Sequence, residues 1–74
     1  MRMEEKLQTI YDVLYEDLLT SREIMLRSNE LLDEKDKLKS GENIRCLKLL
    51  ENEGLIKNTY VELEGSYGYF LYHR

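Results

Sequence analysis

The chain has 74 residues, enough for one small domain, and its 15 acidic and 11 basic residues give a net charge of −4. A single cysteine excludes an internal disulfide and a cysteine-based zinc site. The sequence has no run of about 20 apolar residues that would span a membrane and no apolar signal-peptide core at its start, so we expect a cytoplasmic protein.

The first expected element is an amphipathic helix over about residues 4–19. Apolar side chains recur there at spacings of three and four, which places them along one stripe of a helix. The stripe consists of Leu7, Ile10, Tyr11, Leu14, Tyr15 and Leu18. We expect the exposed apolar part of this helix, at Tyr11, Tyr15 and Leu19, to form the contact surface of a homodimer.

A second helix is expected over about residues 21–32. Thr20 and Glu23 have the spacing of a capping box, in which the hydroxyl and the carboxylate accept backbone N–H groups at the helix start. The positions expected to point inward are Ile24, Met25, Ser28, Leu31 and Leu32. Residues 33–39 follow as a charged connector with one apolar residue, Leu38, and form either a loop or an early turn of the next helix.

The third helix is expected over about residues 40–53, with Ser40 as its N-cap and Gly54 as its C-terminal stop. Helical geometry puts Ile44, Leu47 and Leu50 on the face that packs against the first two helices. The opposite face carries Glu42, Arg45, Lys48 and Asn52, with Leu49 at its edge.

The C-terminal part of the chain is expected to form a hairpin over about residues 55–74. Leu55 and Ile56 make a short strand or an anchor after the third helix. In residues 59–63 and again in 69–74, successive side chains alternate with the period of two that is typical of β-strands. Residues 64–68 lie between them as a turn, with glycine where the turn needs a positive φ.

This order of elements resembles a winged helix-turn-helix domain, and residues 40–56 carry the resemblance most specifically. The most characteristic part is Leu50-Glu-Asn-Glu-Gly-Leu-Ile56, with a leucine at the helix end, a glycine at the stop and an apolar pair after it. This pattern resembles the PadR-like and MarR-like regulators, although Asn43 stands where those families commonly have an apolar residue. The resemblance covers about residues 7–74 and implies an α+β fold in one domain, residues 1–74, with three helices followed by a C-terminal β-hairpin wing.

By this resemblance, we expect a small transcriptional regulator that binds double-stranded DNA sequence-specifically. The third helix would lie in the major groove of a promoter and alter polymerase access, and a dimer would read two half-sites about one helical turn apart. Residues 21–48, which include most of this helix, carry seven basic and six acidic residues and are the least acidic part of the chain.

Candidate DNA contacts gather on and around the third helix. Arg45 and Lys48 are three residues apart on its outward face, where an arginine suits a bidentate contact to guanine. Ser40 and Asn43 lie near its positive end and suit a phosphate, and Glu42 suits the amino group of cytosine. The full set of expected DNA-binding residues is Arg22, Lys37, Lys39, Ser40, Glu42, Asn43, Arg45, Lys48 and Tyr67.

Other function classes remain beside DNA binding. The acidic net charge and the acidic wing, with Glu62 and Glu64, favour a winged helix that binds protein in a transcription or assembly complex. A further alternative is a phage or plasmid accessory protein that binds a host factor. No Gly-rich phosphate loop, nucleophile elbow or paired carboxylates are visible, so we expect neither an enzyme nor a cofactor. Cys46 is expected to be a small buried hydrophobe, and His73 stands alone, so no metal is expected.

Overall fold

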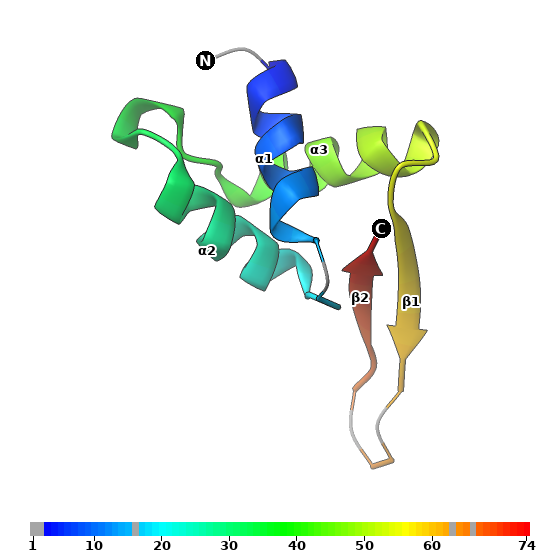
Figure 1. The fold of residues 1–74 in the computed structure, drawn as a ribbon. Coiled ribbons are helices and arrows are strands. Elements are labelled where there is room, and N and C mark those ends of the chain that lie inside the picture. Colours follow the sequence, from blue (N-terminus) through cyan, green and yellow to red (C-terminus); the bar gives the residue numbers. More distant parts are fainter. Residues whose placement is uncertain (1–2, 16, 63, 66) are drawn as a thin grey trace.

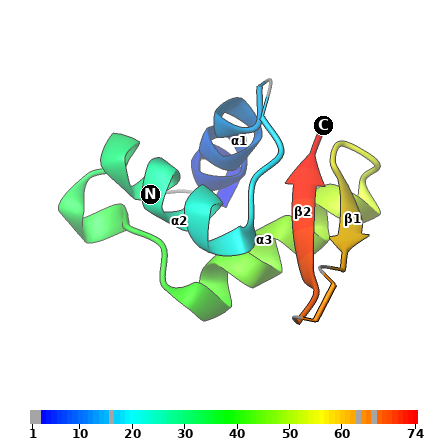
Figure 2. The same ribbon diagram turned by 90° about the horizontal axis from the view of Figure 1, so that it is seen from below.

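The computed structural model describes residues 3–15, 17–62, 64–65 and 67–74. The elements in this part of the chain are α1 (Met3–Val13), α2 (Ser21–Leu31), the short 3₁₀ turn η1 (Glu34–Asp36), α3 (Ser40–Asn52), β1 (Lys57–Val61) and β2 (Tyr69–His73). The three helices pack together, and the hairpin of β1 and β2 projects away from them (Figure 1). Seen from below, the hairpin stands beside the C-terminal end of α3 (Figure 2). The α+β fold predicted from the sequence is confirmed.

The first helix is shorter than predicted. It ends at Val13, whereas the sequence pattern predicts an end near residue 19. Leu19 has left the helix to pair with β2: its N–H donates to the Tyr72 carbonyl at 3.1 Å, and the Tyr72 N–H donates back at 2.7 Å. This bridge adds a third, very short antiparallel segment to the hairpin. It also buries Leu19 and leaves Leu18 exposed, which reverses the predicted placement of these two side chains.

The second helix follows the prediction closely at its start. The Glu23 N–H donates to the Thr20 hydroxyl at 3.2 Å, and the Thr20 N–H donates to the Glu23 carboxylate at 3.0 Å, which confirms the capping box. That backbone N–H of Thr20 lowers the pKa of Glu23. Ile24 and Ser28 are buried as expected, whereas Leu31 is 68% exposed and its predicted inward position is wrong.

The third helix is rotated relative to the predicted phase. Ile44 was expected to point inward but is 45% exposed, while Asn43 is buried in its place. Asn43 points inward because its side-chain amide forms hydrogen bonds with Ser21. It donates to the Ser21 carbonyl at 3.0 Å and to the Ser21 hydroxyl at 3.2 Å, which joins the first turns of α2 and α3. The N-cap is also one residue earlier than predicted, because Lys39 and not Ser40 occupies it, with no side-chain capping bond.

The end of α3 confirms the predicted glycine stop. Gly54 has φ 74°, a left-handed conformation that glycine adopts without a steric penalty. Its N–H donates to the Glu51 carbonyl at 2.9 Å, and the next N–H, of Leu55, donates to the Leu50 carbonyl at 3.0 Å. These two bonds make a Schellman motif, which satisfies the last carbonyls of the helix and fixes the direction of the chain into β1.

The hairpin is antiparallel, with Lys57 opposite His73 and Val61 opposite Tyr69. Tyr60 and Phe70 are cross-strand partners whose rings meet edge to face, with centroids 5.1 Å apart. Gly65 has φ 72°, so the predicted glycine turn is confirmed.

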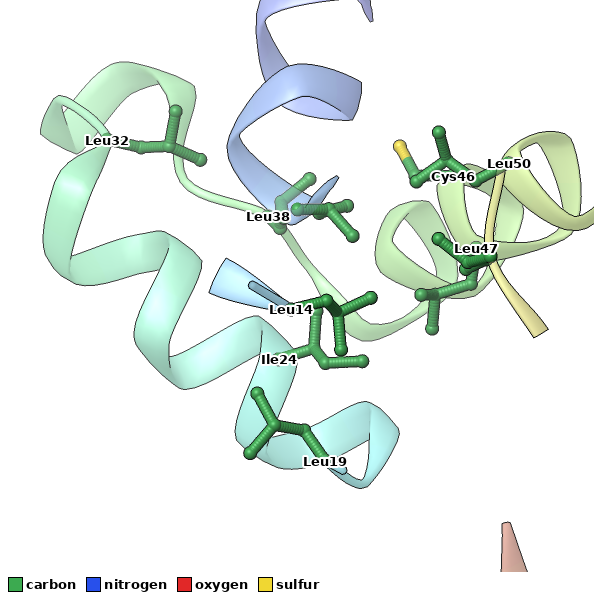
Figure 3. Close-up of a cluster of buried hydrophobic side chains, with 10 residues drawn as sticks. Leu14, Leu19, Ile24, Leu32, Leu38, Cys46, Leu47 and Leu50 are labelled. Atoms are coloured by element: carbon green, nitrogen blue, oxygen red, sulfur yellow. The ribbon is translucent and has the colours of Figure 1, made fainter. Parts of the chain in front are cut away.

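A single buried core joins the three helices (Figure 3). Its side chains come from α1, from the segments that flank α2 and α3, and from the inward faces of those two helices. They are Ile10, Leu14, Leu19, Ile24, Leu32, Leu38, Cys46, Leu47, Leu50 and Ile56. Among the described hairpin residues, Tyr72 packs against this core, so the outer half of the hairpin extends beyond it. No helix within the described ranges has the length and apolar character needed to cross a bilayer.

Candidate nucleic-acid interface

The outward face of α3 presents two basic side chains. Arg45 and Lys48 are both exposed, as predicted from their spacing. Neither forms an ion pair with any residue that the structure describes, and the same is true of Arg22 in the first turn of α2. Their charges are therefore available to a ligand. Two apolar side chains flank them, since Ile44 is 45% exposed and Leu49 is 44% exposed.

The acidic residue in the first turn of the same helix, Glu42, is held by α1. The Lys6 ammonium donates to the Glu42 carboxylate at 2.6 Å, and both side chains are largely covered by the protein. This hydrogen bond is the main reason that the pKa of Glu42 is lowered, and the backbone N–H of Lys39 adds to the effect. Glu42 was a candidate contact to cytosine, but here its carboxylate ties α3 to α1. Its negative charge is offset before any phosphate approaches.

The start of α3 is exposed at Ser40 and Gly41, next to the Glu42 carboxylate that accepts the Lys39 N–H. The first intrahelical bond runs from the Asn43 N–H to the Lys39 carbonyl, so no earlier N–H of the helix has a partner four residues back. Ser40 is exposed, and the position of a side chain at Gly41 has no neighbouring atom within 4 Å. Lys39 is exposed at the N-cap itself. The positive end of the helix dipole and one lysine thus meet at a place where a phosphate can approach.

Two predicted DNA contacts have other roles in the structure. Asn43 is only 1% exposed and holds Ser21, so it does not reach a ligand, and that prediction is wrong. The Lys37 ammonium donates to the carbonyls of Asn29 and Leu32, the latter at 3.2 Å. It therefore caps the C-terminal end of α2. The Asn43 contact joins segments that are distant along the chain, and Lys37 reaches back five and eight residues across the connector.

The wing is a poor electrostatic match for DNA. Tyr67 is 94% exposed, so it is free to contact a ligand as predicted. Glu62 and Glu64 are exposed beside it and bring negative charge to the same end of the hairpin. Exposed aromatic rings lie further along the strands, with Tyr60 at 54% and Phe70 at 51% exposure. The tip of the wing thus offers apolar and acidic surface, whereas Arg22, Lys39, Arg45 and Lys48 lie on or next to the helices.

The predicted dimer surface is not assembled in this structure. Leu19 is buried by its bridge to Tyr72. Tyr11 is covered by Arg74, whose guanidinium lies 3.8 Å from the ring centroid and donates to the Tyr11 carbonyl at 2.8 and 3.0 Å. Of the three residues, only Tyr15 keeps a large exposed surface.

Cys46 is fully buried, and this burial raises the pKa of its thiol, which confirms the prediction of a small buried hydrophobe. Within the described residues, no three His, Cys, Asp or Glu side chains come together as a metal site.

Three helices, an antiparallel hairpin and the bridge from the segment between α1 and α2 give the chain the layout of a winged helix-turn-helix domain. No family model matches the chain, and no curated protein or solved structure matches it. The placement of individual side chains therefore carries the functional argument.

Proposed function

We propose that this domain binds double-stranded DNA as a small transcriptional regulator, with α3 lying in the major groove. The observation that supports this most strongly is the outward face of α3, where Arg45 and Lys48 are exposed and without ionic partners among the described residues. Lys6 offsets the one acidic side chain in the first turns of that helix. A rigid helix with one buried face and donors on the other is the usual reader of base edges.

Each basic group has a distinct role in this proposal. Arg45 donates two hydrogen bonds to O6 and N7 of a guanine, and Lys48 contacts an adjacent base or phosphate. The open start of α3, with Lys39 and the Ser40 hydroxyl, binds a phosphate and sets the register of the helix. Arg22 contacts a second phosphate from the start of α2. A promoter occupied in this way is closed to polymerase.

The test is fluorescence anisotropy of a labelled random duplex at low salt. The wild type should bind, and Arg45→Glu/Lys48→Glu should lose most of its affinity, because two positive charges at the groove become negative. Lys35→Glu/Lys57→Glu is the matched control, since both residues are exposed and lie outside the proposed contact surface. Circular dichroism checks that both variants are folded. Equal loss of affinity in the two variants would show a nonspecific charge effect and contradict a role for α3.

A protein-binding winged helix is the second candidate. It is favoured by the net charge of −4 and by the exposed aromatic residues of an acidic wing. A host factor bound by a phage or plasmid accessory protein belongs to the same class. In this case, the charge reversal on α3 leaves the affinity for the partner intact, and the wild type shows no affinity for duplex DNA.

A further inference from the structure

An apolar groove lies between α1 and the C-terminal end of α3. Its volume is about 440 Å³, which is within the range of about 300–1,000 Å³ typical of binding sites. The lining residues are Leu7, Gln8, Tyr11, Leu49, Leu50, Glu53 and Leu55. The groove is therefore walled mainly by leucine and tyrosine, and it adjoins the face of α3 that presents Arg45 and Lys48, with Leu49 at the shared edge.

The groove is open and preformed. Leu49 and Leu55 on its walls are 44% and 48% exposed, so their apolar surface faces solvent and not the core. Leu55 is held in place by the Schellman motif, in which its N–H donates to the Leu50 carbonyl at 3.0 Å. Exposed apolar residues gathered in a fixed hollow mark a surface that a partner covers. An open groove of this kind fits the apolar ridge of a helix.

The edge of the groove is acidic. Glu53 is part of its lining. The Asp12 carboxylate accepts a hydrogen bond from the Gln8 amide, also in the lining, at 2.8 Å. Arg74 pairs with Asp12 at 3.8 Å and also covers the Tyr11 ring, so Glu53 is the carboxylate at this edge that has no ion pair with a described residue. No lining residue is basic. A second copy docked face to face would bring these carboxylates together, because a two-fold interface uses the same patch on both copies.

We propose that this groove binds an amphipathic, basic helix of a partner protein. Apolar residues of the partner helix at i, i+3 or i+4, and i+7 enter the groove between Leu7, Leu49 and Leu55. Lysine or arginine on its flank pairs with Glu53. This docking does not rest on the proposed DNA binding, since it uses none of the residues proposed to contact DNA.

The test uses labelled synthetic helices of about four turns. One peptide carries leucines at the stated spacing and lysines on its flanks, and a second has glutamates in place of the lysines. Fluorescence anisotropy with the full chain should show saturable binding of the lysine peptide and not of the glutamate peptide. Leu49→Gln should weaken this binding about tenfold, whereas Leu31→Gln, at a more exposed leucine on α2, should not.

A charge reversal separates groove binding from general attraction to an acidic protein. Glu53→Lys should weaken the lysine peptide and improve the glutamate peptide, while Glu34→Lys in the connector should change neither preference. The proposal is overturned if neither peptide saturates, or if Leu49→Gln and Leu31→Gln have equal effects. It is also overturned if sedimentation equilibrium shows a dimer of the chain that Leu49→Gln dissociates, since the occupant is then a second copy.

Discussion

Replacing Lys6 with methionine removes the cation that holds Glu42 and keeps most of the apolar stem. The pair joins α1 to α3 through a bond of 2.6 Å, and the Lys6 and Glu42 side chains are 13% and 24% exposed. An exposed ion pair is worth about 0.2–1 kcal/mol, whereas breaking a fully buried one costs about 3–5 kcal/mol. Residual exposure of Glu42 lets water screen the charge. We therefore expect the free energy of unfolding at pH 7 to fall by about 1–2 kcal/mol.

The loss of stability in Lys6→Met should depend on pH. The folded protein lowers the pKa of Glu42 below its ordinary value of 4.5, so the stabilisation is present above that value. It is lost as the pH falls through the lower pKa of the folded state. The difference in stability between the wild type and Lys6→Met should therefore shrink as Glu42 becomes protonated.

Urea unfolding followed by circular dichroism measures both effects. Lys57→Met is the matched control, because Lys57 is exposed and makes no ion pair with the described residues. In Lys6→Met/Glu42→Gln, part of the lost stability should return, since no unpaired carboxylate remains. An unchanged unfolding midpoint for Lys6→Met at pH 7, or a difference that persists unchanged in acid, would refute the reasoning.

Two further predictions concern the positions at which α1 and α3 end. Gly54→Ala should lower the free energy of unfolding by about 1–2 kcal/mol, because φ 74° is costly for any residue with a Cβ; Gly41→Ala, where the added methyl group meets no atom, should be neutral or stabilising in the same urea titration. Leu19→Ala should cost about 2–4 kcal/mol and Leu18→Ala less than about 0.5 kcal/mol, since only the first is buried. A larger cost at Leu18 than at Leu19 would instead support the longer first helix that periodicity predicts.

Signals that act over a few residues were readable from the sequence. The Thr20–Glu23 capping box spans one turn, and the Gly54 stop and the Gly65 turn each depend on the conformation of a single glycine. The outward direction of Arg45 and Lys48 follows from helical periodicity once the helix is placed. These features predicted the α+β fold and the central part of the candidate interface.

The errors came from bonds between distant parts of the chain. Leu19 leaves the first helix for a partner on the last strand, and the amide of Asn43 turns inward for a partner at the start of α2. Hydrophobic periodicity assigns an asparagine to the surface, so it placed Ile44 inward instead. Lys37 is occupied by a nearer contact, since its carbonyl partners lie five and eight residues before it, on and just after α2.

The groove beside α3 was also invisible in the sequence. In the sequence, Leu49 lies at the edge of a helix face and Leu55 is an anchor after that helix. Neither residue by itself indicates a binding surface. They become a binding surface only when α1 brings Leu7 and Tyr11 next to them. A hollow between two elements depends on how the helices cross, which the pattern within either helix does not determine.

The most direct test of α3 as a DNA reader is the salt dependence of duplex binding by the wild type. Three exposed cations, Arg22, Lys39 and Lys48, are placed to contact phosphates, so the logarithm of the binding constant should fall with the logarithm of salt concentration at a slope of about −2.7. Arg45→Glu/Lys48→Glu removes one of these contacts and reverses two charges, so the slope should become shallower by about one or more. A folded wild type that shows no binding at low salt, or binding with a slope near zero, would contradict the proposal.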